Sequence, residues 1–193
     1  MGIIYAFTGT HASGKSTIGK AMEENGFVYY KETAQILIDR GEAPWLQGSG
    51  ISGPEFQARI FDLEIRREQE ILERLSEKPA IVESYHLGNI AHCDLQGAEE
   101  IARRTRVHLG MLVRQHEIRG VHFKVDPDKI PERTRQYPNG MSSEQIAFYA
   151  RLCPTIIGIY REFDIPFQVI DTNMSIAETI EATLMVLEAK RSA

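Results

Sequence analysis

The residues from Gly9 to Thr17 have the types and spacing for phosphate chemistry in this chain of 193 residues. They fit the pattern G-x-x-x-x-G-K-[ST], with Gly9, Gly14, Lys15 and Ser16 at its fixed positions. In this pattern the backbone N–H groups wrap a phosphate, because the glycines allow a close approach that a Cβ would block. The lysine reaches the terminal phosphates, and the serine hydroxyl can ligate Mg²⁺. The pattern therefore predicts a site for a nucleoside triphosphate, with ATP and Mg²⁺ as the expected ligands.

The surroundings of this loop favour a phosphate site over a chance glycine-rich turn. An apolar segment, residues 3–8, precedes the loop and is expected to form a buried strand. A helical pattern from Lys15 to about Asn25 follows it, so the helix N-terminus would point at the same anion. Lys15 is the predicted catalytic cation of the loop. The predicted phosphate-binding residues are Gly9, Thr10, His11, Ala12, Ser13, Gly14, Lys15, Ser16 and Thr17.

The elements that must position this loop alternate between strands and helices. Short apolar segments predict strands at 3–8, 27–30, 80–82, 120–125 and 167–170. Helical patterns cover 15–25, 32–40, 52–78, 97–118, 142–163 and 175–190, with Pro154 expected to kink or split the fifth helix. Such alternation predicts an α/β fold of three layers, with a parallel sheet of about five strands and helices on both faces. Residues 1–193 are expected to form a single domain, with a polar, proline-containing loop at about 127–142.

Composition narrows the classes of function. The chain has 22 basic and 27 acidic residues, a net charge of −5, which argues against general nucleic-acid binding. No apolar segment approaches the roughly 20 residues that cross a bilayer, so no membrane association is expected. The two cysteines and the absence of a signal-like N-terminus predict a cytoplasmic protein. The six histidines show no metal-ligand spacing along the chain, so no zinc site is expected.

Acidic and basic residues beyond the loop complete a candidate site. Glu83 ends the apolar strand at 80–82. The phosphate loop and this strand resemble those of P-loop kinases, and the resemblance implies that Glu83 holds Mg²⁺ with Ser16. The alternative is a surface acid at a strand end. Arg133 and Arg135 lie in the loop at about 127–142, which resembles the lid of such kinases. The resemblance implies that an arginine arriving on closure neutralises phosphate charge, and the alternative is a solvated basic loop. Glu32 follows the second strand.

In the order of these features, the chain resembles the nucleoside and nucleoside-monophosphate kinases among the P-loop proteins. Thymidylate kinases, deoxynucleoside kinases and nicotinamide-riboside-kinase-like domains are the most similar types. The resemblance implies a small-molecule kinase that moves the γ-phosphate of ATP to a nucleoside, nucleotide or similar metabolite. It also implies a homodimer. Where thymidylate kinases have Asp-Arg-aromatic and deoxynucleoside kinases Glu-Arg-Ser, this chain has Glu83-Ser84-Tyr85, so the subfamily stays open.

The same resemblance assigns the substrate residues. A glutamate at the place of Glu32 acts as base on the substrate hydroxyl in deoxynucleoside kinases, whereas a monophosphate acceptor needs no base. The alternative for Glu32 is a charge that interacts with the helix dipole. The segment with Phe56, Gln57 and Arg59 resembles the helix that reads the nucleobase, and its alternative is a core phenylalanine beside surface residues.

Two functions of other classes remain open beside the kinase. One is an ATPase or GTPase that acts as a hydrolytic switch, and the other is a nucleotide-binding sensor without phosphotransfer. Asp94-Leu95-Gln96-Gly97 matches the D-x-x-G motif of GTPases by letter, but it lies about ten residues past the third strand, too far for a metal-linked aspartate. The arginines of the lid argue against an inert sensor.

Overall fold

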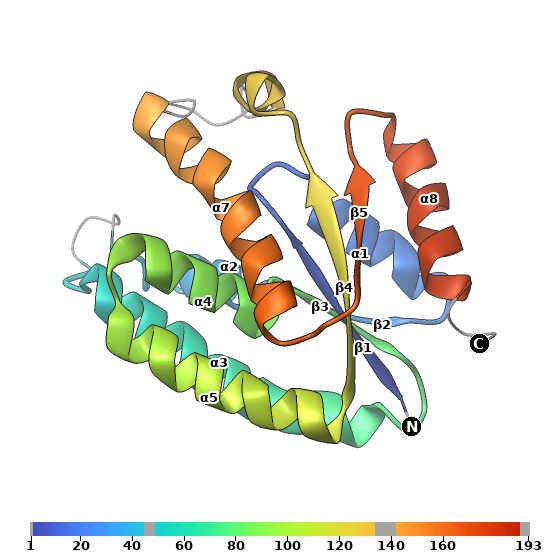
Figure 1. The fold of residues 1–193 in the computed structure, drawn as a ribbon, viewed down its shortest axis with the longest axis horizontal. Helices are drawn as coiled ribbons and strands as arrows, with labels where there is room; N and C mark the ends of the chain where they lie inside the picture. Colours follow the sequence, from blue (N-terminus) through green and yellow to red (C-terminus); the bar gives the residue numbers. More distant parts are fainter. Residues whose placement is uncertain (1, 45–48, 134–141, 190–193) are drawn as a thin grey trace.

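The computed structural model describes residues 2–44, 49–133 and 142–189, and it shows a three-layer α/β fold (Figure 1). Five parallel strands form the central sheet in the order β2-β3-β1-β4-β5. This arrangement confirms the predicted fold class and the predicted number of strands. The strands are β1 (Ile3–Gly9), β2 (Val28–Tyr30), β3 (Ala80–Glu83), β4 (Glu117–Lys124) and β5 (Phe167–Asp171).

Successive residues of β1 pack on opposite faces of the sheet, as expected of a strand that is buried on both sides. Ile4 and Ala6 belong to one apolar cluster, and Tyr5 and Phe7 belong to the other. None of the four side chains is more than 1% exposed. The apolar sequence of residues 3–8 thus places β1 at the centre of the sheet, where its carboxyl end can support a site.

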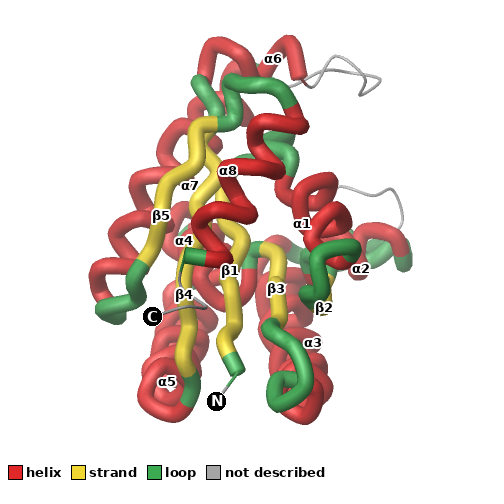
Figure 2. The backbone as a smooth tube through the Cα atoms, turned by 90° about the vertical axis from the view of Figure 1, so that its right-hand side faces the viewer, coloured by secondary structure: helices red, strands yellow, loops and turns green. Residues whose placement is uncertain are grey.

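Helices cover both faces of the sheet, as Figures 1 and 2 show from two directions. One face carries α1 (Lys15–Glu23) and α8 (Ile176–Glu188). The other carries α3 (Gly53–Arg74), α4 (Tyr85–Gln96), α5 (Glu99–Gln115) and α7 (Ser143–Glu162). Three short elements lie near the carboxyl ends of the strands: α2 (Thr33–Asp39), the 3-10 turn η1 (Pro127–Lys129) and α6 (Ile130–Arg133). None of the helices that the structure describes is long and apolar enough to cross a membrane.

Serine caps fix the starts of three helices at the positions that the sequence predicts. The Ser52 side chain accepts a hydrogen bond from the backbone N–H of Glu55, at the start of α3. Ser142 and Ser175 form complete capping boxes with Gln145 and Glu178 before α7 and α8. Each cap satisfies a backbone N–H that the helix itself leaves unpaired.

The structure differs from the sequence prediction in three elements. Helix α4 was not predicted, because it is buried on most sides and lacks the one-sided apolar stripe of a surface helix. Residues 117 and 118, assigned to the preceding helix, form the start of β4. Pro154 does not split α7, which continues to Glu162 with Leu152 and Ile156 buried on either side of the proline.

Candidate active site

The loop between β1 and α1 has a backbone that requires glycine at two positions. Gly9 has a φ of 142° and Gly14 a φ of 85°, both of which disfavour residues with a side chain. A Cβ on Gly9 would also collide with the backbone carbonyl oxygen of Phe123 on β4. The loop therefore lies tightly against the neighbouring strand and leads directly into the N-terminus of α1, where unpaired helix N–H groups favour an anion.

Replacing Gly9 with alanine is expected to destabilise the protein more than replacing Gly14. The Gly9→Ala variant combines a glycine-only backbone conformation with a backbone collision, which together cost about 3 kcal/mol. Gly14→Ala meets open space and has only the left-handed backbone penalty of about 1 kcal/mol. Thermal unfolding of both variants should show a difference of about 4–8 °C in Tm. Equal Tm values would contradict this account of the loop.

Lys15 lies at the first position of α1, with its side chain turned into the loop. Its Nζ donates hydrogen bonds to the carbonyl oxygens of Gly9 and Thr10, at 3.1 and 3.0 Å. The residue is only 6% exposed, and its Nζ lies 3.9 Å from Oε1 of Glu83. The ammonium group is therefore held at the mouth of the loop by three oxygen atoms.

Glu83, at the end of β3, meets Ser16 as the sequence predicts. The Ser16 hydroxyl donates to both carboxylate oxygens of Glu83, at 2.9 and 3.0 Å, and the Tyr29 hydroxyl donates to Oε2. Burial and the charge of Glu83 raise the pKa of Tyr29, so the phenol stays protonated and remains a donor. Glu83 is 3% exposed, so the alternative of a surface acid at the strand end does not hold.

The loop and Glu83 fit a triphosphate with its metal ion. The hydroxyl oxygens of Thr10 and Ser13 are buried inside the loop and have no hydrogen-bond partner among the described residues. Such donors suit phosphate oxygens, which accept hydrogen bonds. Hydroxyl and carboxylate oxygens are the ligands that Mg²⁺ takes from proteins, so Ser16 and Glu83 fit the ion.

Glu32 is connected to the end of β3 by a hydrogen bond from Ser84, the residue that follows Glu83. It occupies the N-cap position of α2, after β2, and its Oε1 accepts a hydrogen bond of 2.9 Å from the Ser84 hydroxyl. Ser84 has a φ of 63°, in the left-handed region that residues with a Cβ seldom adopt. This backbone turn directs Ser84 toward Glu32 and leaves the Glu83 carboxylate facing α1.

Two cavities adjoin at these residues. The first, of about 590 Å³, is lined by the phosphate loop, Glu83, Arg133 and Thr172. The second, of about 340 Å³, lies between α2, α3, α4 and α7. The residues that line both cavities are His11, Lys15, Glu32 and Gln35. A molecule in the second cavity would therefore meet a phosphate in the first beside Lys15 and Glu32.

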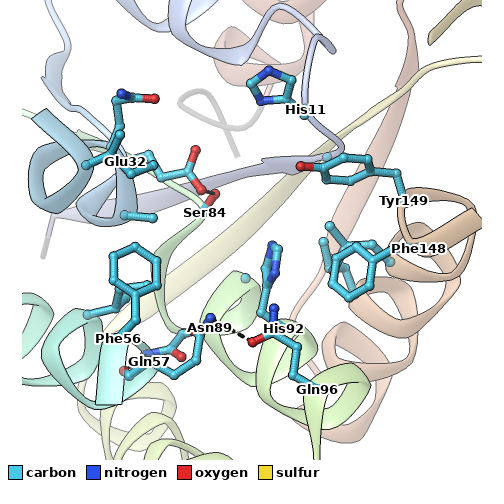
Figure 3. Close-up of a pocket in the computed structure, with 18 of the residues that line it drawn as sticks. His11, Glu32, Phe56, Gln57, Ser84, Asn89, His92, Gln96, Phe148 and Tyr149 are labelled. Carbon is cyan, nitrogen blue, oxygen red and sulfur yellow. Dashed lines mark hydrogen bonds between the residues drawn. The ribbon is translucent and has the colours of Figure 1, made fainter. Parts of the chain in front are cut away.

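The second cavity has aromatic walls and a polar floor, as Figure 3 shows. Phe56 on α3 faces Phe148 and Tyr149 on α7 across the cavity. The Gln57 amide, 4% exposed, donates to Oε1 of Gln96 at 3.2 Å, and its own Oε1 is buried with no partner among the described residues. The polar residues of the floor are Gln57, Asn89, His92 and Gln96.

The second cavity offers little positive charge. Burial, reinforced by the charge of Lys15, lowers the pKa of His92 to about 4 and also lowers the pKa of His11, so both imidazoles are neutral near pH 7. Among the described residues that line it, the remaining charged side chains are Lys15, Glu32 and Glu64. The cavity therefore suits a neutral, flat molecule with hydrogen-bonding edges better than an anion.

The two predicted lid arginines have different outcomes. Arg133, in α6, lies across the first cavity and donates to the Ala12 carbonyl oxygen at 3.4 Å. It also donates to the hydroxyl of Thr172 at 3.1 Å and to the Thr172 carbonyl oxygen. Arg135 and half of the predicted lid at 127–142, residues 134–141, lie outside the described residues.

Arg59 is not brought to the site. Its guanidinium forms ion pairs with Glu42 and Glu55, at 2.7 and 2.8 Å, and it lines neither cavity. Phe56 and Gln57, by contrast, line the second cavity, and Thr17 lines the first beside Ser16. The Arg59 side chain is therefore held by Glu42, in the loop after α2, and by Glu55, on α3 itself.

Sequence reasoning missed the contribution of α4 and α7. Asn89, His92 and Gln96 line the second cavity from α4, and Phe148 and Tyr149 line it from α7. The three α4 residues are spaced i, i+3 and i+7, which places them on one face of a helix. This polar spacing could have indicated the helix and its site-facing side. Asp94, on the same helix, forms an ion pair with Arg106 at 2.7 Å and lines neither cavity.

Comparisons of sequence identify no relative: no protein-family model matches the chain, and no curated protein matches it. Comparisons of structure find proteins with a similar fold. A thymidylate kinase from Candida albicans matches with a TM-score of 0.68 at 12% identity, over 98% of this chain and 92% of the other. A thymidylate kinase from Ehrlichia chaffeensis matches with a TM-score of 0.66 at 16% identity, over 97% and 99%.

A deoxyadenosine kinase from M. mycoides, with the products dCMP and dCDP bound, matches with a TM-score of 0.57 at 16% identity. This match covers 96% of the present chain and 98% of the kinase. At these identities the matches bear on the fold and leave the substrate open. The chain has the fold of the P-loop nucleoside and nucleotide kinases.

Proposed function

We propose that this protein is an ATP- and Mg²⁺-dependent kinase that phosphorylates a hydroxyl group of a neutral, nucleoside-like metabolite. The observation that supports it most is the pair of adjoining cavities with Lys15 and Glu32 at their junction. A hydrolytic switch has no need for a second cavity of about 340 Å³ with aromatic walls. Transfer of a phosphoryl group depends chiefly on positioning and charge stabilisation, which two adjoining sites can supply.

The first cavity would hold the donor. The loop N–H groups and the hydroxyls of Thr10 and Ser13 would bind phosphate oxygens, and Ser16 and Glu83 would hold the metal ion. Mg²⁺, when bound, offsets charge on the triphosphate. Lys15 would exchange its hydrogen bonds to Gly9 and Thr10 for bonds to the transferring phosphoryl group.

The second cavity would hold the acceptor. Phe56 and Phe148 suit the faces of a flat heterocycle, and the amides of Gln57 and Asn89 suit its polar edge. Because the described lining has one lysine, two glutamates and neutral imidazoles, a nucleoside is favoured over a nucleoside monophosphate. The charge of the cavity lining thus favours one acceptor class, nucleosides, whereas the fold is shared by kinases for nucleosides and for nucleotides.

A hydroxyl acceptor needs a base, and we assign that role to Glu32. Its carboxylate lines both cavities, and the Ser84 hydroxyl holds one of its oxygens. As the substrate oxygen forms its bond to the γ-phosphorus, the Glu32 carboxylate would take the hydroxyl proton, and the bond from phosphorus to the bridging oxygen of ADP would break. Lys15 would stabilise the charge that develops on the phosphoryl oxygens.

Arg133→Ala is expected to raise the KM for ATP by about 10-fold, equivalent to about 1.4 kcal/mol, with a smaller change in kcat. The reason is that Arg133 lies against the loop and Thr172 in the first cavity, where a guanidinium favours an anionic donor. Steady-state kinetics with varied ATP measure this change. Arg151→Ala, an exposed arginine of α7, is the matched control. An unchanged KM in Arg133→Ala would contradict its assignment to the donor site.

The proposal is tested by ADP release from ATP and Mg²⁺, with and without a panel of nucleosides and nucleoside monophosphates. The expected result is release that depends on a nucleoside. Release that depends on a monophosphate would keep the kinase and overturn the proposed acceptor. Release without any acceptor would favour a hydrolase, and ATP binding without release would favour a sensor.

A further inference from the structure

A second cluster of ionisable side chains lies between three helices, away from the phosphate loop. It consists of Glu68 on α3, His86 on α4 and His108 on α5. One side-chain ligand atom from each residue lies within 4.8 Å of the other two. Glu68 is 4% exposed and His86 is fully buried, while the His108 side chain is 21% exposed. The sequence alone did not suggest this group, because its members are far apart along the chain.

Of two distances between ligand atoms in the cluster, one is shorter and one is longer than the separation found around a tetrahedral metal ion. The Glu68 Oε2 atom lies 2.6 Å from Nε2 of His108 and 3.8 Å from Nε2 of His86. Around a tetrahedral ion with bonds of about 2.0–2.1 Å, ligand atoms lie about 3.3–3.5 Å apart. The two imidazole rings have centroids 5.0 Å apart at an interplanar angle of 71°. Rings that bind one tetrahedral ion through nitrogen also have centroids about 5 Å apart, as the same bond lengths require.

Neighbouring side chains orient the three ligands. The Glu64 Oε2 atom lies 3.0 Å from Nδ1 of His86, which leaves Nε2 directed at Glu68. The Tyr85 hydroxyl donates to Oε1 of Glu68 at 3.0 Å, which leaves Oε2 free to face the histidines. A carboxylate behind a metal-binding histidine, and a hydrogen bond to a metal-binding carboxylate, are the usual supports of such a site.

The cluster buries two ring nitrogens of His86 and two carboxylates between the helices. Neither ring nitrogen of His86 has an aligned hydrogen-bond partner among the described residues, although the ring is fully buried. Glu64 and Glu68 add two carboxylates that are 5% and 4% exposed. Buried carboxylates require compensation, which a protonated His86 between them can supply. A divalent cation would take the place of that proton, balance both carboxylates and bind a nitrogen of His86.

We propose that Glu68, His86 and His108 bind a divalent transition-metal ion of the Zn²⁺ type, with Glu64 and Tyr85 as their supports. Two histidines and one carboxylate are a ligand set that Zn²⁺ takes in proteins, and it leaves a fourth position open. His108 reaches solvent, so water can enter that position. The ion would join α3, α4 and α5, two of which also line the second cavity.

Titration of the metal-free protein with Co²⁺ tests this site without any nucleotide. Excess Mg²⁺ is present so that the phosphate loop does not compete. The expected result is one Co²⁺ per chain with the visible absorption of a tetrahedral site, displaced by Zn²⁺. His108→Gln should abolish this spectrum, and Glu64→Gln should weaken binding by about 10–100-fold, as is typical for supporting residues.

Three controls make the result decisive. His116→Gln changes a histidine just beyond α5 that is not in the cluster and should bind Co²⁺ as the unaltered protein does. Glu83→Gln should also retain the spectrum, because it alters only the phosphate-loop site. His108 is partly exposed, so His108→Gln is expected to fold, which circular dichroism checks. Failure of the unaltered protein to bind Co²⁺ or Zn²⁺, or unchanged binding in His108→Gln, would overturn the proposal.

Discussion

Lys15→Ala should lower kcat for acceptor-dependent ADP formation by at least about 10²–10³-fold, the usual effect of losing one group that stabilises transition-state charge. Lys15 is held at the junction of the two cavities, 6% exposed, with its Nζ on the carbonyl oxygens of Gly9 and Thr10. These bonds preorganise the ammonium group beside the position where the phosphoryl group would transfer. Initial rates at saturating ATP and acceptor measure the effect.

Lys20→Ala is the matched control for this prediction. It removes an exposed lysine from the same helix, one that lines neither cavity. Its rate should equal that of the unaltered protein, and both variants should unfold cooperatively in a thermal melt. A Lys15→Ala variant that is folded and retains its rate would remove the phosphate loop from the mechanism.

Glu32→Gln should lower kcat for phosphorylation of a nucleoside by about 10²–10⁴-fold, the contribution of a positioned general base. The amide keeps the shape of the side chain and can still accept from the Ser84 hydroxyl, but it does not take a proton. Because Glu32 lies at the junction and not within the phosphate loop, the KM for ATP should change little. Steady-state kinetics in both substrates separate kcat from KM.

The outcome of Glu32→Gln also distinguishes two acceptor classes. A monophosphate oxygen is already anionic, so a kinase for monophosphates would retain most of its activity. Glu24→Gln, at the exposed C-cap of α1, controls for loss of a carboxylate elsewhere. If Glu32→Gln is as active as this control with a nucleoside acceptor, Glu32 is not the base.

Elements could be predicted from the sequence where the pattern of apolar residues or a helix cap matches the place of the element in the fold. β1 is apolar because both of its faces are buried, and α7 and α8 begin at serine capping boxes that the sequence displays. Helix α4 escaped prediction because His86, Gly88 and Asn89 are buried together with its apolar residues. Because α4 packs against α3, α5, α7 and β1, apolar residues lie on several of its sides and its apolar periodicity is weak.

The candidate site could be predicted where its residues are consecutive in the sequence. Gly9 to Thr17 contain the phosphate loop in consecutive residues, and Glu83 follows from its place at the end of a strand. The second cavity was only partly predictable, since Gln57, Asn89 and Tyr149 come from three helices and meet only in the folded chain. Arg59 shows the converse: its place in a local pattern suggested a substrate contact, but Glu42 and Glu55 hold it at the surface.

The fate of the γ-phosphate distinguishes transfer to a nucleoside-like hydroxyl from hydrolysis of ATP. ATP labelled in the γ-phosphate is incubated with the protein, Mg²⁺ and each nucleoside of a panel, and the labelled products are separated. We expect the label in a nucleoside monophosphate and expect no such product with Lys15→Ala. Label found only in inorganic phosphate, at a rate that no acceptor changes, would contradict this transfer.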